Sequence, residues 1–142
     1  MADNRVTLVE VGLRDGLQNE KTPVSPAQRA DWFNALVEAG HRRIEAGSFV
    51  SPKWVPQMAG TDEVMALIHK PDHVTAEVLV PNQKGLEAAL QTSAEVVAVF
   101  TSASESFNQK NINCSVEESI ERFRPVVDGA KAAGRRVRGY VS

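Results

Sequence analysis

The stretch Glu10–Glu20, E-V-G-L-R-D-G-L-Q-N-E, contains the residue types best suited to chemistry in this chain. It places a cation, a carboxylate and an amide, Arg14, Asp15 and Gln18, in a turn that contains two glycines. The apolar run before the turn predicts a buried strand over Val6–Gly12. Charged groups at the end of a buried strand are costly unless a ligand binds there. A solvated turn in which Arg14 pairs with Asp15 is the alternative, and this stretch alone favours neither.

Two kinds of chemistry fit these side chains. Asp15 is the best candidate for a metal ligand, because carboxylate oxygens suit a hard divalent cation such as Mg²⁺ or Mn²⁺. Arg14 is a fixed cation that would stabilise an oxyanion developing during a reaction. Glu45, near the end of the next expected strand, could join Asp15 at the metal or support it. Glu10 is expected to be buried and to orient Arg14, because an unpaired buried carboxylate is costly.

The elements that position these residues alternate along the chain. Helix-start patterns include Ser25 before a proline and the capping box S-x-x-E that begins at Ser115. Apolar periodicity predicts strands over Val6–Gly12, Arg43–Phe49, Val74–Val80, Glu95–Phe100 and residues 136–142. It predicts helices from Ser25 to Gly40, from Thr61 to before Pro71, over Gln83–Gln91 and from Ser115 to about Gly134, with a long polar loop over Thr101–Asn113.

This order indicates parallel strands with crossover helices, arranged either as an open doubly wound sheet or as a closed (β/α)₈ barrel. The first strand is not followed by G-x-G-x-x-G, so a dinucleotide site has no support. An open sheet would leave the last strand exposed, which is an aggregation liability. We therefore predict an α/β fold: the first five strands and four helices of a TIM barrel. Residues 1–142 would be the N-terminal part of one catalytic domain, ending before a sixth strand.

Composition excludes several classes of protein. With 16 basic and 18 acidic residues, the chain lacks the basic excess of a nucleic-acid-binding protein. No apolar run approaches the length that spans a bilayer, so no membrane partner is expected. The first residues, M-A-D-N-R-V, show no targeting pattern. A single cysteine, Cys114, rules out an internal disulfide and fits a reducing compartment, so we expect a cytoplasmic location.

Several segments resemble the 3-hydroxy-3-methylglutaryl-CoA lyase family, and the similarity covers essentially the whole chain. The R-D-G-x-Q core is shared with a wider superfamily of metal-dependent barrels, including isopropylmalate and homocitrate synthases and carboxyltransferase domains. F-V-S-P-K-W-V-P-Q-M and K-N-I-N-C-S are more specific to the lyase. The matching segments are Val9–Lys21, Ser48–Met58, Pro81–Gly85, Ser104–Ser115 and Val137–Ser142.

The resemblance implies a (β/α)₈ barrel with Mg²⁺ or Mn²⁺ at the carboxyl ends of its strands. It implies retro-Claisen cleavage of 3-hydroxy-3-methylglutaryl-CoA to acetoacetate and acetyl-CoA, by a full-length protein that is a homodimer. Asp15 matches a metal ligand, and Arg14 matches the arginine that binds substrate and stabilises the enolate. Glu45 matches a residue that supports the metal site or acid–base chemistry.

The remaining residues carried over from the family lie around that centre. Gln18 and Ser48 match substrate contacts, and Lys21 and Asn111 match positions near the CoA moiety. Two charges match positions inside the barrel that support the site, Glu10 and Arg138.

The family's other metal ligands, an H-x-H pair and an asparagine, and its catalytic cysteine match nothing in this sequence. Cys114 does not occupy that cysteine's position. The chain is therefore expected to carry about half of the site and to be inactive alone. Two alternatives stay open: an acetyl-CoA-dependent enzyme of the same superfamily that condenses a 2-oxo acid, and a non-catalytic half-barrel that pairs with another chain.

Overall fold

The computed structural model describes residues 5–142, and within this range the chain forms four strands and five α-helices. The strands are β1 (Arg43–Ser48), β2 (Thr75–Leu79), β3 (Val96–Thr101) and β4 (Arg136–Val141). The α-helices are α1 (Pro26–Glu38), α2 (Thr61–Leu67), α3 (Gln83–Leu90), α4 (Glu105–Ile112) and α5 (Val116–Ala132). Two shorter helical turns are η1 (Gly12–Gly16) and η2 (Pro56–Met58).

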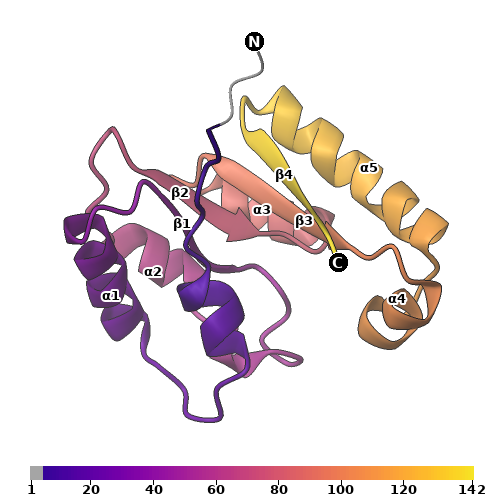
Figure 1. Ribbon diagram of the computed structural model, residues 1–142, viewed down its shortest axis with the longest axis horizontal. Coiled ribbons are helices and arrows are strands. Elements are labelled where there is room, and N and C mark those ends of the chain that lie inside the picture. The colour runs from indigo at the N-terminus through magenta and orange to yellow at the C-terminus, as the bar shows by residue number, and fades with distance from the viewer. Residues whose placement is uncertain (1–4) are drawn as a thin grey trace.

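The four strands form one parallel sheet in the order β1-β2-β3-β4. Each strand therefore lies beside the one that follows it in the chain, whereas a doubly wound sheet reverses its strand order at a switch point. Helices α1, α2, α3 and α5 pack on one face of the sheet, and Figure 1 shows α1 and α2 toward the β1 edge, α5 toward the β4 edge and α3 behind the strands. Sequential parallel strands with helices between them are the arrangement of a barrel segment, as predicted.

The two faces of the sheet differ in chemistry, because successive strand residues point to opposite faces. Apolar residues on one face form the core with the helices. This core includes Ile44, Ala46, Ala76, Val78 and Val97 from the strands, and Phe33, Val64, Leu86 and Val126 from the helices. The other face carries charged residues, which form the candidate site.

The predicted helix starts are confirmed by side-chain caps. The Ser25 hydroxyl accepts a hydrogen bond from the Gln28 N–H at 3.2 Å. Ser115 and Glu118 form a reciprocal capping box, with each side chain accepting from the other residue's backbone N–H, at 3.0 and 2.8 Å. Such caps satisfy N–H groups that have no partner inside the helix.

The first predicted strand is wrong, so the described residues contain four strands rather than five. The segment pairs with β1 only at Glu10, which donates to the Arg43 carbonyl at 2.9 Å and accepts from the Glu45 N–H at 2.8 Å. Val6 and Leu8 are 84% and 80% exposed. Among the described residues, no second strand or helix covers this segment, so its apolar side chains have no core to enter.

The predicted loop Thr101–Asn113 is also wrong, because α4 forms within it. Ser104 caps the helix by accepting from the Phe107 N–H at 3.3 Å, and Asn113 ends it with a φ of 52°. The helix is mostly polar and exposed, so it lacks the apolar periodicity by which helices are predicted. It raises the number of α-helices from the four predicted to five.

In the part of the chain that the structure describes, no helix is long and apolar enough to cross a membrane. The expectation that the first residues carry no targeting pattern falls partly on residues 1–4, which lie outside the described range.

Candidate active site

The turn η1 gives Arg14 and Asp15 different degrees of burial. The Val11 carbonyl accepts from the N–H groups of Arg14 at 3.1 Å and Asp15 at 2.7 Å, and from a third N–H at 3.5 Å. This wider-than-normal turn buries Arg14, which is 6% exposed, while the Asp15 side chain remains 61% exposed. Single turns of this kind occur often at functional sites.

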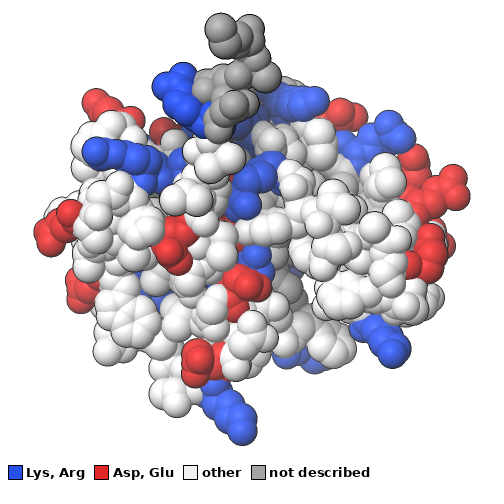
Figure 2. Space-filling view, in the orientation of Figure 1, with Lys and Arg blue, Asp and Glu red and all other residues white. Residues whose placement is uncertain are grey.

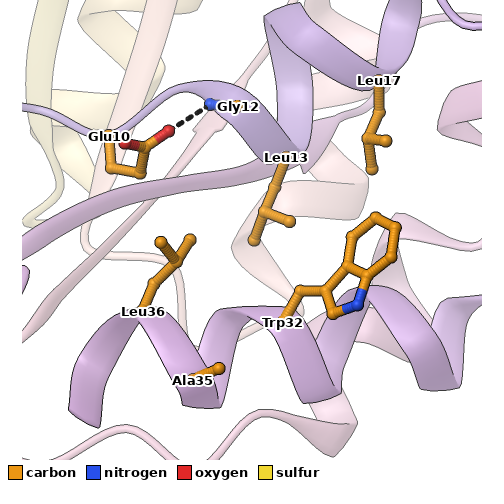
Figure 3. A pocket seen from close by; sticks show the side chains of 7 residues that line it. All are labelled: Glu10, Gly12, Leu13, Leu17, Trp32, Ala35 and Leu36. Carbon is orange, nitrogen blue, oxygen red and sulfur yellow. Dashed lines mark hydrogen bonds between the residues drawn. The ribbon is translucent and has the colours of Figure 1, made fainter. Parts of the chain in front are cut away.

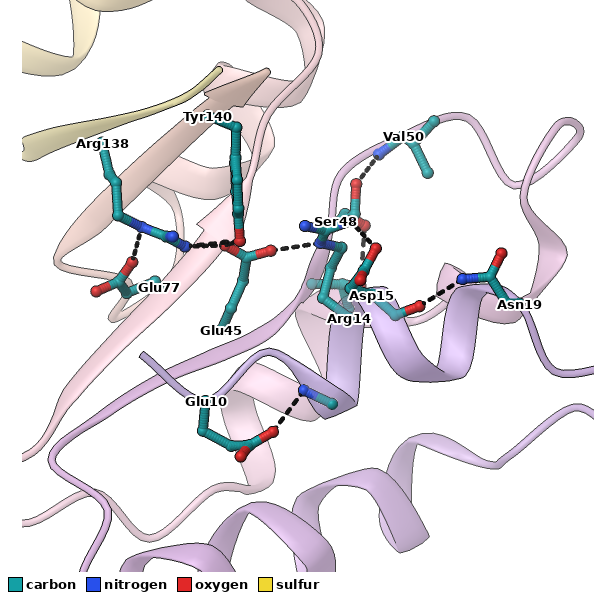
Figure 4. Close-up of polar contacts among 12 residues, drawn as sticks. Glu10, Arg14, Asp15, Asn19, Glu45, Ser48, Val50, Glu77, Arg138 and Tyr140 are labelled. Atoms are coloured by element: carbon teal, nitrogen blue, oxygen red, sulfur yellow. Dashed lines mark hydrogen bonds and ion pairs between the residues drawn. The ribbon is translucent and has the colours of Figure 1, made fainter. Parts of the chain in front are cut away.

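Glu45 is the centre of the polar cluster and is fully buried. Its Oε1 accepts from Arg14 Nε, and its Oε2 accepts from Arg138 Nη2 and from the Tyr140 hydroxyl at 2.9 Å. The β1–β2 register shifts between Glu45 and Gly47, and such bulges re-aim side chains beside active sites. Figure 4 shows Arg14 and Arg138 approaching Glu45 from opposite sides.

The cluster continues across the charged face as a ladder of alternating charges. Arg138 Nε donates to Glu77 Oε2 at 2.7 Å, and Arg43 Nε donates to Glu77 Oε1 at 2.6 Å. Glu77, like Glu45, is fully buried. Both carboxylates therefore lie between cations, which is the pairing that buried charges require. We call this set the charge ladder, and its members in order are Arg14, Glu45, Arg138, Glu77 and Arg43.

The pKa values of the site residues follow from this pairing. Burial lowers the pKa of Arg14, but the charge of Glu45 and hydrogen bonds to Glu45 and Tyr140 raise it by more, so it lies above its ordinary value. Arg138 shows the same balance, with Glu77 adding to the rise in its pKa. Burial and the charge of Glu45 raise the pKa of Tyr140. At neutral pH Arg14 and Arg138 are thus guanidinium cations, and Tyr140 is a neutral phenol.

Glu10 is not the partner of Arg14, and that prediction is wrong. Its Oε1 accepts from the Gly12 N–H at 2.6 Å, and within the described range no hydrogen bond or ion pair joins it to Arg14. Glu10 lines an open apolar groove with a volume of about 430 Å³. Figure 3 shows it there between η1 and α1, with Leu13, Leu17 and Trp32. Because the chain turns at Gly12, the carboxylate bonds to its own backbone and faces away from the charge ladder.

The other predicted residues take different places. Ser48 is buried at the carboxyl end of β1, where its hydroxyl accepts from the Val50 N–H at 3.1 Å. Gln18 is half-buried just after η1, and Lys21 is exposed. Asn111 is exposed on α4. Within residues 5–142, these last three residues make no hydrogen bond to the ladder, so their roles stay predictions.

Three members of the cluster were not predicted from the sequence: Arg43, Glu77 and Tyr140. Two of them, Arg43 and Tyr140, could have been found from strand alternation. In R-I-E and R-G-Y they lie two positions from Glu45 and Arg138, so each pair shares a strand face. Glu77 stands alone in an apolar strand. A buried carboxylate there requires a cation from another strand.

Asp15 is the site residue best placed to bind a cation from solvent. Its Oδ1 lies 3.1 Å from Arg14 Nη1, and the rest of its carboxylate is open. Glu45 accepts from three donors, so it has little capacity left for a metal. No group of three or more His, Cys, Asp or Glu residues in the described range could hold a metal ion by itself. The chain therefore offers one good oxygen ligand at this site.

Figure 2 shows basic atoms in the hollow between η1 and β4, whereas acidic residues gather at the edge formed by α5. A parallel sheet in sequential order, with paired charges on the face opposite the helices, is the arrangement of an α/β-barrel segment. Residues 5–142 match the HMGL-like family, and the chain belongs to it.

The chain is similar to named members of this family. It is 56% identical over 138 residues to a 3-hydroxy-3-isohexenylglutaryl-CoA/hydroxy-methylglutaryl-CoA lyase of Pseudomonas aeruginosa, covering 97% of this chain and 46% of the relative. It is 52% identical to the mitochondrial hydroxymethylglutaryl-CoA lyase of Homo sapiens, covering 97% of this chain and 42% of the relative. The chain thus spans less than half the length of these relatives.

Solved structures agree with this assignment. The crystal structure of hydroxymethylglutaryl-CoA lyase from Pseudomonas aeruginosa has a TM-score of 0.93 and 55% identity, covering 96% of this chain and 46% of that one. An HMG-CoA lyase from Acinetobacter baumannii, in complex with coenzyme A and 3-methylmalate, has a TM-score of 0.88 and 34% identity. It covers 95% of this chain and 44% of that one. The predicted resemblance and barrel-type fold are therefore confirmed.

Proposed function

We propose that this chain supplies the arginine half of a hydroxymethylglutaryl-CoA lyase site, which cleaves 3-hydroxy-3-methylglutaryl-CoA to acetoacetate and acetyl-CoA. The observation that carries the proposal is Arg14, a buried guanidinium held by Glu45. It lies in a chain 56% identical over 138 residues to a lyase of that name. The chain covers 46% of that relative, so the test below joins it to the complementary portion.

Arg14 suits the step in which the carbon–carbon bond breaks. Cleavage leaves the electron pair on acetyl-CoA as an enolate, so negative charge develops on the thioester oxygen. A cation fixed before the reaction stabilises such an oxygen without reorganisation. Arg14 is fixed through Nε by Glu45 and through Nη1 by Asp15. Glu45, whose two oxygens already accept from three donors, would serve to hold Arg14 and not to exchange protons with substrate.

Asp15 would supply one ligand to a divalent cation, Mg²⁺ or Mn²⁺. Mg²⁺ is commonly bound through one or two carboxylates together with waters and substrate oxygens, which fits an exposed Asp15. When bound beside Asp15, the cation would supply Lewis-acid chemistry that lowers the pKa of the substrate's tertiary hydroxyl. The ion pair with Arg14 orients the Asp15 carboxylate.

The substrate would lie across the carboxyl ends of the strands. We assign Gln18 and Ser48 as contacts to the acyl group, and Lys21 and Asn111 as contacts to the CoA moiety. Exposure of Lys21 and Asn111 is compatible with binding a large cofactor that extends into solvent. A homodimeric full-length enzyme and a cytoplasmic location stay predictions.

The test joins this chain to the complementary portion of the Pseudomonas aeruginosa relative and measures acetoacetate release with Mg²⁺ or Mn²⁺. We expect acetoacetate from 3-hydroxy-3-methylglutaryl-CoA. A folded, metal-loaded enzyme that instead condenses acetyl-CoA with a 2-oxo acid would support the synthase alternative. A stable oligomer of the chain alone, with no activity after joining, would support a non-catalytic half-barrel.

A further inference from the structure

Tyr140 is the chain's single tyrosine, and it lies against both arginines that bind Glu45. The Arg14 and Arg138 guanidinium carbons lie 5.2 and 4.4 Å from the centre of its ring. Guanidinium groups at this distance from an aromatic ring are attracted by its π electrons. The ring is half-buried near the carboxyl end of β4. Tyr140 therefore contacts the ladder at the end where Arg14 lies.

The direction of the Tyr140 hydroxyl proton follows from its two partners. Arg138 Nη2 lies 3.0 Å from the hydroxyl oxygen and can only donate. Glu45 Oε2 lies 2.9 Å away and accepts. The phenol has one proton, so it points to Glu45. The hydroxyl consequently bridges the cation and the carboxylate.

This bridge limits how the Glu45 carboxylate can turn. Its Oε2 is held by both Arg138 and Tyr140, which leaves Oε1 for Arg14 Nε. Without the hydroxyl, Oε2 would keep Arg138 alone. A carboxylate then tends toward a bidentate ion pair, in which both of its oxygens accept from one guanidinium, because that geometry is strongly favoured. Such a pair with Arg138 would draw Oε1 away from Arg14.

We propose that Tyr140 is a positioning residue, whose hydroxyl and ring hold Glu45 and Arg14 in the orientation that presents Arg14 to the reacting thioester. Its effect on catalysis rests on the proposed function of Arg14. The positioning of Arg14 does not, and it can be measured in this chain without substrate.

The first experiment records the arginine Nε–Hε signals of the ¹⁵N-labelled chain by NMR, with the Arg14 signal assigned by its loss in Arg14→Lys. In Tyr140→Phe we expect hydrogen exchange at Arg14 Nε to accelerate about tenfold, because its bond to Glu45 weakens. Thr75→Val is the matched control. It removes a hydroxyl that accepts from Arg136 Nη2 at 3.2 Å at the opposite end of the strands. An unchanged Arg14 signal in folded Tyr140→Phe would overturn the proposal.

The second experiment measures acetoacetate release by the joined enzyme described above. Tyr140→Phe is expected to lower kcat by about 10- to 100-fold with little change in KM, because Arg14 acts on the reacting centre. Thr75→Val should retain the parent kcat. An unchanged kcat in Tyr140→Phe would contradict the catalytic consequence. If the joined parent makes no acetoacetate, the proposed function fails, and the NMR result still decides whether Tyr140 positions Arg14.

Discussion

Arg14 Nε donates to Glu45 Oε1, and this bond joins the η1 turn to strand β1 across 31 positions of the chain. Arg14 depends on Glu45 for its orientation, and Glu45 depends on two cations to remain buried. The same contact is thus part of the fold and part of the candidate active site. The five charges of the ladder are arranged around this contact, so a substitution of one member should change the interaction energies of the others.

Glu45→Gln should destabilise the chain strongly. The variant removes the charge that lies between Arg14 and Arg138 and leaves two partly buried cations without their shared partner. Breaking a buried ion pair on one side costs about 3 kcal/mol or more of the free energy of unfolding. Urea denaturation followed by circular dichroism measures this loss.

The matched control is Glu121→Gln, which breaks an exposed ion pair with Arg124 on α5. Solvent screens that pair, so no measurable change in the urea midpoint is expected. Equal midpoints for the parent and Glu45→Gln would show that the ladder does not stabilise the fold.

Tyr140 should ionise at a higher pH than an ordinary tyrosine, because burial and the charge of Glu45 raise its pKa. It is the only tyrosine, so tyrosinate absorbance reports this group alone. Its raised pKa in the folded state favours folding below the ordinary tyrosine pKa of about 10, and this contribution is lost as the pH rises through the folded-state value. The parent should therefore lose stability in that window by more than Tyr140→Phe does. A pH titration of tyrosinate absorbance with its midpoint at or below that of free tyrosine would contradict the burial and pairing of Tyr140.

Gly12→Ala should destabilise the η1 turn. A Cβ at this position would lie 2.8 Å from Glu10 Oε1, which is hydrogen-bonded to the Gly12 N–H. Glu10 would have to move and give up that bond, at a cost of about 1 kcal/mol. In Gly16→Ala, by contrast, the added Cβ meets nothing within 4 Å. Denaturant unfolding should show the loss only in Gly12→Ala, and equal losses in the two variants would contradict the tight approach of Glu10.

The chain alone should bind Mg²⁺ or Mn²⁺ weakly, with a Kd on the order of 1 mM or weaker, because Asp15 is one ligand and Glu45 is saturated by its donors. Calorimetric titration with Mn²⁺ checks this, and Asp15→Asn should abolish the residual heat. In the joined enzyme, chelation should remove activity, and added Mn²⁺ should restore it. A tight one-to-one isotherm for the chain alone would show that it carries more ligands than Asp15.

Local features of the sequence predicted much of the fold. Caps such as Ser25 and Ser115 act within three residues, so they can be recognised without tertiary structure. The strands β1 to β4 appear within a residue or two of their predicted bounds. The segment before Glu10 failed as a strand because strand formation depends on pairing and packing partners elsewhere in the chain, and its apolar pattern does not specify them. The polar helix α4 carries no such pattern at all.

The candidate site was less predictable, because its contacts are long-range. Four of the residues predicted from the sequence lie together in the structure: Arg14, Asp15, Glu45 and Arg138. The sequence predicted the wrong carboxylate partner for Arg14, however, naming Glu10 where the structure has Glu45. Glu45 lies 93 positions from Arg138, and their contact is set by strand order and register. The spacing of residues along the sequence does not indicate which distant residues form such a pair.

The measurement that tests the central claim most directly is the kcat of acetoacetate release by the joined enzyme with Arg14→Gln. If Arg14 stabilises the enolate oxygen, kcat should fall by about 100- to 1,000-fold relative to the joined parent, as when a donor to a reacting oxyanion is removed. Arg124→Ala, a change on the exposed face of α5, should leave kcat near the parent value. A folded Arg14→Gln enzyme with the parent's kcat would contradict the claim that this buried arginine performs the chemistry.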